Sequence, residues 1–287
     1  MNGNVFLSGQ CDLHTHSVAS DGTDTPTQLV CKANECGLRA IALCDHNTLA
    51  GIPELLVAAK KYGTDAVPGI EISSEYEGCE VHIIGLFIPD EAFAPLDDFL
   101  EQVRLAKLSA YQELYEALVG AGYKLSYDAI FTRNGESINR VHFARELMKR
   151  GYVATISEAF SELLREGGKF YHPTKRPDAL KVIALLSSLS CVSVLAHPFL
   201  SLDEPSLLRL LPQAKRCGLV AIEAIYSTFD PEQRERLAEL ASEHGLLVSG
   251  GSDYHGDNKP NIRLGIGTGD LNVPSSIYET LAKLSAR

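Results

Sequence analysis

The sequence predicts an α/β protein, a barrel of alternating strands and helices interrupted by a mostly helical insertion. Strand and helix signals alternate over the first ninety residues and resume at Val192, whereas helix signals dominate between them. Alternation of this kind is typical of a parallel sheet with crossover helices. We therefore expect a barrel domain made of residues 1–94 and 190–287, with residues 95–189 inserted as a capping domain.

Local signals place the individual elements. Thr25, Pro26 and Gly37 stand as N-cap, first-turn proline and C-terminal stop, so a helix is predicted over residues 26–37. Short apolar runs predict buried strands, and apolar residues at helical spacing predict helices. On these grounds we expect further helices at 52–62, 96–120, 138–150, 156–165, 177–189, 204–217 and 231–244, and strands at 10–14, 38–43, 66–72, 81–88, 192–196, 220–225 and 246–249.

Composition and charge exclude several classes of function. The 287-residue chain is 45% hydrophobic, and its net charge is −11. Extended nucleic acid would need a basic surface, and an anionic substrate would need bound cations beside it. The seven cysteines form no C-x-x-C pair, so we expect reduced thiols, mostly buried, in a cytoplasmic protein. No leader and no apolar run of ~20 residues is present, so no membrane contact is expected.

Histidines and acidic residues recur where the predicted strands end. They are His14 and His16 after the first strand, Asp45 and His46 at the end of the second, Glu71 at the end of the third, His82 on the fourth, His197 at the end of the strand after the insertion, and Asp253 and His255 after the last strand. In a parallel barrel all strands end at one face, where catalytic residues gather. The sequence therefore predicts that distant segments deliver these side chains to one place.

The residue types indicate a metal centre. Imidazole and carboxylate ligands together favour Mn, Zn or Fe over Mg or Ca. His14 and His16 are two positions apart on an extended segment, so both can grip one cation from the same side. The two oxygens of Glu71 can bridge two cations. His142 and His244 are expected to lie outside this set, because one sits in the insertion and the other ends a helix.

Several motifs together resemble the polymerase and histidinol phosphatase (PHP) family. They are residues 12–17 (DLHTHS), 20–23 (SDGT), 44–48 (CDHNT), 68–73 (PGIEIS), 80–85 (EVHIIG), 196–198 (AHP) and 251–255 (GSDYH). They occur in the expected order and cover nearly the whole chain. The resemblance implies a distorted (β/α)7 TIM-like barrel with two or three divalent metal ions at its C-terminal face.

By analogy with the family, the ligands divide among three metals, and Glu71 is shared by two of them. One metal would be held by His14, His16, Glu71 and Asp253, a second by Glu71, His82 and His197, and a third by Asp21, His46 and His255. Asn47 departs from the pattern, since many relatives carry an acid there, and we expect it to tune the site rather than abolish it. Some relatives have histidine in place of Asp21, so the identity and affinity of the third metal are left open.

The insertion resembles that of stand-alone PHP phosphoesterases acting on small phosphorylated metabolites. Residues 138–145 (INRVHFAR) carry this likeness. In that group the insertion caps the metals and supplies basic groups for phosphate. The expected substrate-binding residues are Arg140, Asn139, Lys169, Lys175 and Arg176.

The resemblance implies hydrolysis of a phosphate ester by a metal-bridging hydroxide, because bound metals lower the pKa of water. Asp253 is assigned to the catalytic set, and His255, His172 or a metal-bound water would protonate the leaving group. A nucleoside 3′,5′-bisphosphate or 5′-monophosphate is the expected substrate, with a phosphorylated ribose cyclic phosphate as the alternative. A metal-dependent C–N hydrolase and a non-catalytic metal-binding module are weaker readings, and the sequence leaves the oligomeric state open.

Overall fold

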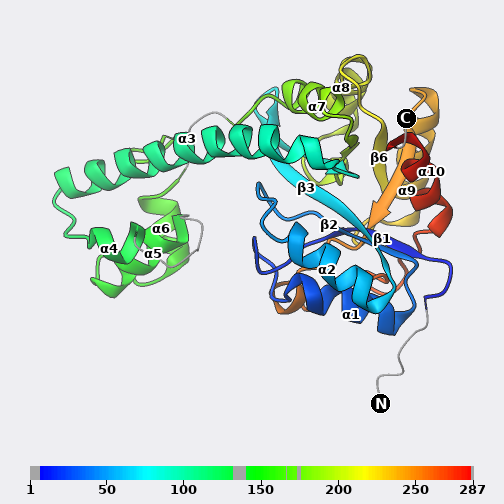
Figure 1. Cartoon of the computed structure of the whole chain (residues 1–287). Coiled ribbons are helices and arrows are strands. Elements are labelled where there is room, and N and C mark those ends of the chain that lie inside the picture. The colour runs from blue at the N-terminus through cyan, green and yellow to red at the C-terminus, as the bar shows by residue number, and fades with distance from the viewer. Residues whose placement is uncertain (1–6, 132–139, 166, 173–175, 286–287) are drawn as a thin grey trace. The chain divides into compact units, whose positions relative to one another are not determined.

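A computed structural model describes residues 7–131, 140–165, 167–172 and 176–285 (Figure 1). The chain divides into two compact units. The first contains residues 1–97 and 176–287, and the second contains residues 98–175. These bounds differ from the 95 and 189 expected from the sequence, and the first of them falls within the long helix at residues 93–120.

The first unit contains the sheet and the helices around it. Its strands are β1 (Cys11–Thr15), β2 (Ala40–Leu43), β3 (Asp65–Tyr76), β4 (Cys79–Leu86), β5 (Val192–Leu195), β6 (Ala221–Tyr226) and β7 (Leu247–Gly251). Its helices are α1 (Pro26–Cys36), α2 (Ile52–Tyr62), α7 (Ala179–Ser188), α8 (Glu204–Arg216), α9 (Pro231–Glu243) and α10 (Ser275–Ser285), with 3₁₀ turns η1 (Asp90–Ala92), η2 (Pro198–Leu200) and η3 (Gly256–Asn258).

The second unit is helical. It contains most of α3 (Phe93–Gly120), followed by α4 (Tyr127–Phe131), α5 (Arg140–Lys149) and α6 (Ile156–Glu162). These helices surround an apolar core of their own, in which Phe143 and Leu147 of α5 meet Leu114 and Leu118 of α3. Every secondary-structure element described in this unit is a helix.

Helix α7 was expected in the insertion but lies in the first unit. Its buried residues Val182, Ile183 and Leu186 form one apolar face. The side chain of Leu186 lies against the backbone at Gly85 of β4, where there is no room for a side chain. The helix belongs to the barrel because this face packs against the sheet.

Within the described residues, the seven strands form one sheet in sequence order. The expectation of a fully parallel sheet is wrong at β4, which pairs antiparallel with both β3 and β5. A tight hairpin causes the reversal, since Glu77 and Gly78 both have positive φ (50° and 82°) between β3 and β4. Two residues with positive φ are typical of a turn that joins antiparallel strands directly.

The sheet curls into a nearly closed barrel. The end of β1 meets the segment after β7, where His16 N donates to Tyr254 O (2.9 Å) and Asp253 N donates to His14 O (2.8 Å). Asp12 strengthens this seam, because its buried carboxylate accepts hydrogen bonds from Ser252 and from Gly265 N. The seam fixes the two ends of the sheet beside each other.

The barrel interior is apolar toward the beginnings of the strands. Cys11, Ala40 and Ala221 open β1, β2 and β6, and they share a buried cluster with Leu281 of α10. The C-terminal helix, which was not predicted from the sequence, thus packs against the amino ends of the strands. The polar site is consequently confined to the opposite end.

Helix α1 shows how local signals set the outer layer. Thr25 and Gln28 form a capping box, Pro26 opens the helix, and Gly37 ends it with φ 79°. Its buried face includes Leu29 and Val30. In Figure 1, α1 lies beside α2 against the blue end of the sheet. The predicted bounds of both helices agree with the structure to within one residue.

Replacing Asp12 with alanine should destabilise the barrel unit. The change leaves buried donors at the seam without an acceptor, and hydrogen bonds to a charged group contribute about 1.5–3 kcal/mol each. We expect the free energy of unfolding to fall by about 3 kcal/mol, measured by urea denaturation. Asp203→Ala is the control, because this exposed N-cap carboxylate of α8 should cost only about 1 kcal/mol. Equal losses in the two variants would contradict the role of the seam.

Candidate metal centre

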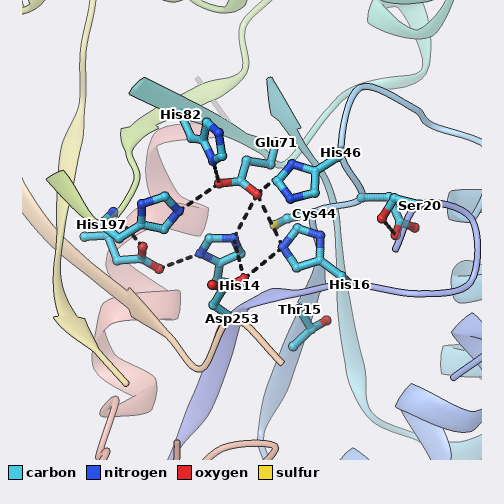
Figure 2. Close-up of polar contacts among 12 residues, drawn as sticks. His14, Thr15, His16, Ser20, Cys44, His46, Glu71, His82, His197 and Asp253 are labelled. Carbon is cyan, nitrogen blue, oxygen red and sulfur yellow. Dashed lines mark hydrogen bonds and ion pairs between the residues drawn. The ribbon is translucent and has the colours of Figure 1, made fainter. Parts of the chain in front are cut away.

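The carboxyl ends of the strands gather the candidate ligands around Glu71 (Figure 2). His14 and His16 come from the end of β1, and His46 follows β2. His197 and Asp253 follow β5 and β7. His82 reaches the same end from near the start of β4, because that strand runs antiparallel. The reversal of β4 therefore explains how a histidine in the first half of a strand joins residues that follow other strands.

The Glu71 carboxylate lies at the centre of the cluster and is fully buried. Its Oε1 lies 2.8 Å from His82 Nδ1 and 3.0 Å from His197 Nε2. Its Oε2 lies 3.3 Å from His14 Nε2, 3.3 Å from His16 Nε2 and 3.1 Å from His46 Nδ1. The two oxygens therefore face two different sets of imidazoles, as a bridging carboxylate would.

Many of these polar atoms have no hydrogen-bond partner among the described residues, although they are buried. They are His14 Nε2, both ring nitrogens of His16, His46 Nδ1, Glu71 Oε2 and His197 Nδ1. A buried polar atom without a partner costs about 1–3 kcal/mol, so such a set must serve a purpose. Three of the ring nitrogens lie 3.1–3.3 Å from Glu71 Oε2 without forming a hydrogen bond to it. Bound cations fit this donor set, since they would satisfy these atoms together.

The ligand atoms fall into overlapping groups, each with its atoms within 4.8 Å of one another. The groups are His14, His16 and Asp253; His46, Glu71 and His82; His16, Asp21, His46 and His255; and His14, His197 and Glu223. All nine residues expected to bind metal thus lie in one cluster. The last group contains Glu223, which the sequence reading did not single out.

Asp253 is held in one orientation by two residues that the sequence reading missed. Its Oδ1 faces the cluster, 3.2 Å from His16 Nε2. Its Oδ2 accepts hydrogen bonds from Tyr226 Oη and Lys259 Nζ, each at 2.7 Å. Burial and the charge of Asp253 raise the pKa of Tyr226, so the hydroxyl stays protonated and donates. Asp253 therefore presents one oxygen to the cluster.

Asp21 is carried on an exposed loop after β1. It lies 3.2 Å from His255 Nε2 and 3.8 Å from His46 Nε2. Asp45, which follows β2, anchors this loop by accepting hydrogen bonds from Ser17 and Ser20. Asp45 therefore orders the loop that brings Asp21 to the histidines.

Asn47, which departs from the family pattern, stabilises the loop after β2. Its φ is 52°, in the left-handed region that asparagine tolerates better than most residues. Its side-chain oxygen accepts a hydrogen bond from Ser73 N of β3 (3.2 Å). Asn47 thus ties the loop after β2 to the strand that carries Glu71.

The protonation of the cluster follows from burial and charge. Burial lowers the pKa of His16 to about 3, so this imidazole is neutral and can donate a lone pair. Burial also opposes a charge on His82, but hydrogen bonds to Glu71 and Glu80 raise its pKa to about 9. Burial opposes ionisation of Glu71, yet nearby His14 and His46 hold its pKa well below the ordinary value. Without a metal, protons on histidines balance the carboxylates.

Two of the expected substrate-binding residues, Asn139 and Lys175, lie outside the described residues. Arg140 and Lys169 belong to the second unit, as does His172, which is exposed. The guanidinium of Arg140 lies over the rings of Phe160 and Tyr171 and donates to Leu164 O (3.2 Å).

Arg176 belongs to the barrel unit and is connected to the metal cluster through one residue. It forms an ion pair with Glu80 (2.8 Å), and Glu80 lies 3.5 Å from His82 Nε2. Of the basic residues expected to bind substrate, Arg176 is the one that the described structure places beside the candidate metal ligands.

A barrel with converging histidines and carboxylates at one end is the arrangement expected of a metal-dependent enzyme. The model of the PHP domain matches residues 12–167. The chain belongs to the PHP family, as its motifs suggested.

Three similar proteins are named as enzymes that cleave phosphate esters. The chain is 32% identical to a 5′-3′ exoribonuclease of Haemophilus influenzae over 87% of its length and 91% of that protein. It is 30% identical to a 3′,5′-nucleoside bisphosphate phosphatase of Chromobacterium violaceum, covering 85% of this chain and 86% of the relative. It is 32% identical to a phosphoribosyl 1,2-cyclic phosphate 1,2-diphosphodiesterase of Eggerthella lenta, covering 85% and 94%.

The fold is also shared with a solved structure. A protein of Bifidobacterium adolescentis, described as a candidate metal-dependent phosphoesterase, superposes with a TM-score of 0.74 at 30% identity over 96% of both chains. The predicted fold class is confirmed. The chain is therefore a metal-dependent phosphoric ester hydrolase, and the reading as a non-catalytic metal-binding module falls away.

No helix in the described ranges combines the length and the apolar character needed to cross a membrane. The sequence predicts no extended nucleic acid as a partner, and one of the similar proteins is named a 5′-3′ exoribonuclease. Net charge describes the whole surface, whereas a cationic metal cluster acts locally on phosphate.

Replacing Glu71 with glutamine should abolish metal binding, because the carboxylate at the centre of the cluster loses its charge and one acceptor oxygen. The wild-type protein should gain about 2.7 kcal/mol of stability at a Mn²⁺ concentration of about 100 Kd, and the variant should gain none. Thermal unfolding with elemental analysis measures both. Glu75→Gln on the same strand is the control and should keep its metal; metal retained in Glu71→Gln would contradict the assignment.

Metal binding should weaken as the pH falls. Below pH 9 the imidazole of His82 is protonated in the metal-free protein, so a cation must displace that proton. We expect proton release on Mn²⁺ binding between pH 6 and 8, and about a tenfold loss of affinity per pH unit for each proton displaced. Calorimetry in buffers of different ionisation enthalpy measures the release. His82→Gln should release about one proton fewer, and no difference would argue against His82 as a ligand.

Proposed function

We propose that this enzyme hydrolyses phosphate esters of nucleotides that carry a second phosphate group. The observation that carries the proposal is the set of buried imidazole and carboxylate atoms around Glu71 that lack partners among the described residues. The similar bisphosphate phosphatase and exoribonuclease support the substrate class.

The two relatives act on different molecules that share one chemical unit. A nucleoside 3′,5′-bisphosphate has phosphates on both sides of its ribose, and so does the first nucleotide of a 5′-phosphorylated RNA. An enzyme that recognises this unit would accept a small nucleotide or an RNA end. This reasoning extends the small-molecule substrate expected from the sequence to short RNA.

We propose two or three divalent cations, held by the nine ligands expected from the sequence. The mixture of imidazole and carboxylate suits Mn, Zn or Fe. Such ions would activate a water molecule and neutralise the charge on the phosphate oxygens. Glu71 would bridge two ions, since its oxygens face different imidazoles.

The tautomer of His255 supports a ligand role. Its Nδ1 lies 2.9 Å from Asp253 O, and a carbonyl oxygen can only accept, so Nδ1 donates. In the neutral ring Nε2 then keeps its lone pair, 3.2 Å from Asp21 Oδ1. We also propose that His172 or His255 protonates the leaving group and that Asp253 takes part in catalysis.

Basic side chains would hold the second phosphate. Arg176 is suited to it, because a planar guanidinium pairs with phosphate through two hydrogen bonds. The insertion, taken as residues 95–189, is proposed to cap the site. It would contribute Arg140, Lys169, Asn139 and Lys175 to phosphate binding. The seven free cysteines suit the cytoplasmic location that we propose for the enzyme.

A cyclic phosphate on a phosphorylated ribose is the second candidate substrate. The specific observation in its favour is the similarity to the Eggerthella lenta cyclic phosphodiesterase. The same metal-centred attack could open a ring and then cleave the monoester. A C–N hydrolase finds no support among the three relatives compared, which act on phosphate esters by name.

A substrate panel with the Mn²⁺-loaded enzyme tests the proposal. Adenosine 3′,5′-bisphosphate and a 5′-phosphorylated oligoribonucleotide should be hydrolysed at least about tenfold more efficiently than adenosine 5′-monophosphate. A ribose cyclic phosphate and an N-acyl amino acid complete the panel, with released phosphate and released amine as readouts. A preference for the cyclic phosphate would favour the second candidate, and turnover of the amide alone would refute both.

Replacing Arg176 with alanine should raise KM for the bisphosphate by about tenfold and change KM for the monophosphate little, because only the former offers a second phosphate. Arg209→Ala is a matched control, since Arg209 also forms a 2.8 Å ion pair with a glutamate of the β3–β4 hairpin, Glu77. Steady-state kinetics measures both. If the two variants behave alike, Arg176 does not recognise phosphate.

A further inference from the structure

Glu223 is a buried carboxylate beside the metal cluster that the nine-ligand set does not include. It lies on β6 with 1% of its surface exposed. The pairing of β6 with β7 shifts register between Glu223 and Ile225. Such irregularities re-aim side chains and occur next to active sites. A carboxylate buried at this place needs hydrogen-bond or charged partners that offset the free-energy cost of removing it from water.

Its two oxygens serve two different ligand residues. Oε1 lies 2.9 Å from His14 Nδ1, and Oε2 accepts a hydrogen bond from the backbone N–H of His197 at 2.9 Å. His14 ends β1 and His197 follows β5, so this carboxylate ties together two strands that are not neighbours in the sheet.

The contact with His14 decides which nitrogen faces the cations. An ionised carboxylate only accepts, so Nδ1 of His14 carries a hydrogen. The neutral ring then has its lone pair on Nε2, the atom that lies 3.3 Å from Glu71 Oε2. In the other tautomer, a hydrogen on Nε2 would point at the place of the cation.

The contact with His197 holds an unusual backbone conformation. His197 has φ 26° and ψ 55°, in a region that non-glycine residues rarely adopt and that costs of order 1–3 kcal/mol. The hydrogen bond to Glu223 fixes the amide at this point. The same conformation directs His197 Nε2 toward Glu71 Oε1, 3.0 Å away.

We propose that Glu223 is a positioning residue that sets the tautomer of His14 and the backbone of His197, and so prepares two cation positions at once. Direct ligation is disfavoured, because both oxygens already engage hydrogen-bond donors. The inference concerns capture of the metal and not the substrate, so it stands or falls separately from the proposed nucleotide specificity.

Glu223→Gln tests the role with little change in shape. The amide nitrogen donates, so it would either favour the wrong tautomer of His14 or lose the bond to His197 N. We expect Mn²⁺ affinity, measured by calorimetry, to fall by about 10–100-fold. In the Zn²⁺-loaded protein, the Nδ1–H proton resonance of His14 should be present in the wild type and lost in the variant.

Two further variants separate positioning from general damage. Glu223→Asp keeps the charge but is one methylene shorter, so its affinity should lie between the wild type and Glu223→Gln. Glu146→Gln is the matched control, because Glu146 is also a buried carboxylate that accepts two hydrogen bonds, in the second unit. Its Mn²⁺ affinity should be unchanged. Wild-type affinity in Glu223→Gln, or an equal loss in Glu146→Gln, would overturn the proposal.

Discussion

The site depends on the contacts between the carboxylate of Glu71 and the imidazoles around it. It is fully buried, and five imidazoles lie within 3.3 Å of its two oxygens. A lone buried carboxylate would be costly, so positive charge must lie beside it. Without metal, protonated histidines supply that charge; with metal bound, neutral histidines would hold the cations that supply it. The barrel supplies the geometry, because strands from distant parts of the chain end around this one residue.

The fold class and eight of the nine expected ligands were predicted from local signals, whereas Asp21 was named only through the resemblance to the PHP family. A proline and a glycine delimit α1, and H-x-H and strand-end acids mark the ligands. The direction of β4 could not be predicted from apolar periodicity, which is the same for parallel and antiparallel strands. Only the Glu77–Gly78 turn carried that information. Helix α7 was misassigned because helical spacing does not say which surface a helix covers.

The supporting residues were harder to predict than the ligands. Asp12 and Asp45 lie within the recognised motifs and turn out to hold backbone and hydroxyl groups. Glu223 and Tyr226 lie in an ordinary apolar strand, where nothing in the spacing distinguishes them. Glu223 contacts His14, which lies more than a hundred residues away in the sequence, and Tyr226 contacts Asp253, which follows the neighbouring strand. Such contacts are properties of the packed barrel and leave no local trace.

The order of the ligands along the chain has a consequence for how the protein matures. The cluster begins at His14 and is completed by Asp253 and His255, on the far side of the inserted helical unit. A chain still emerging from the ribosome holds only fragments of the coordination sphere until residue 255 is free to close the seam with β1. If the nine residues hold metal as proposed, loading would follow synthesis of the chain, and cations captured earlier would meet only incomplete sites.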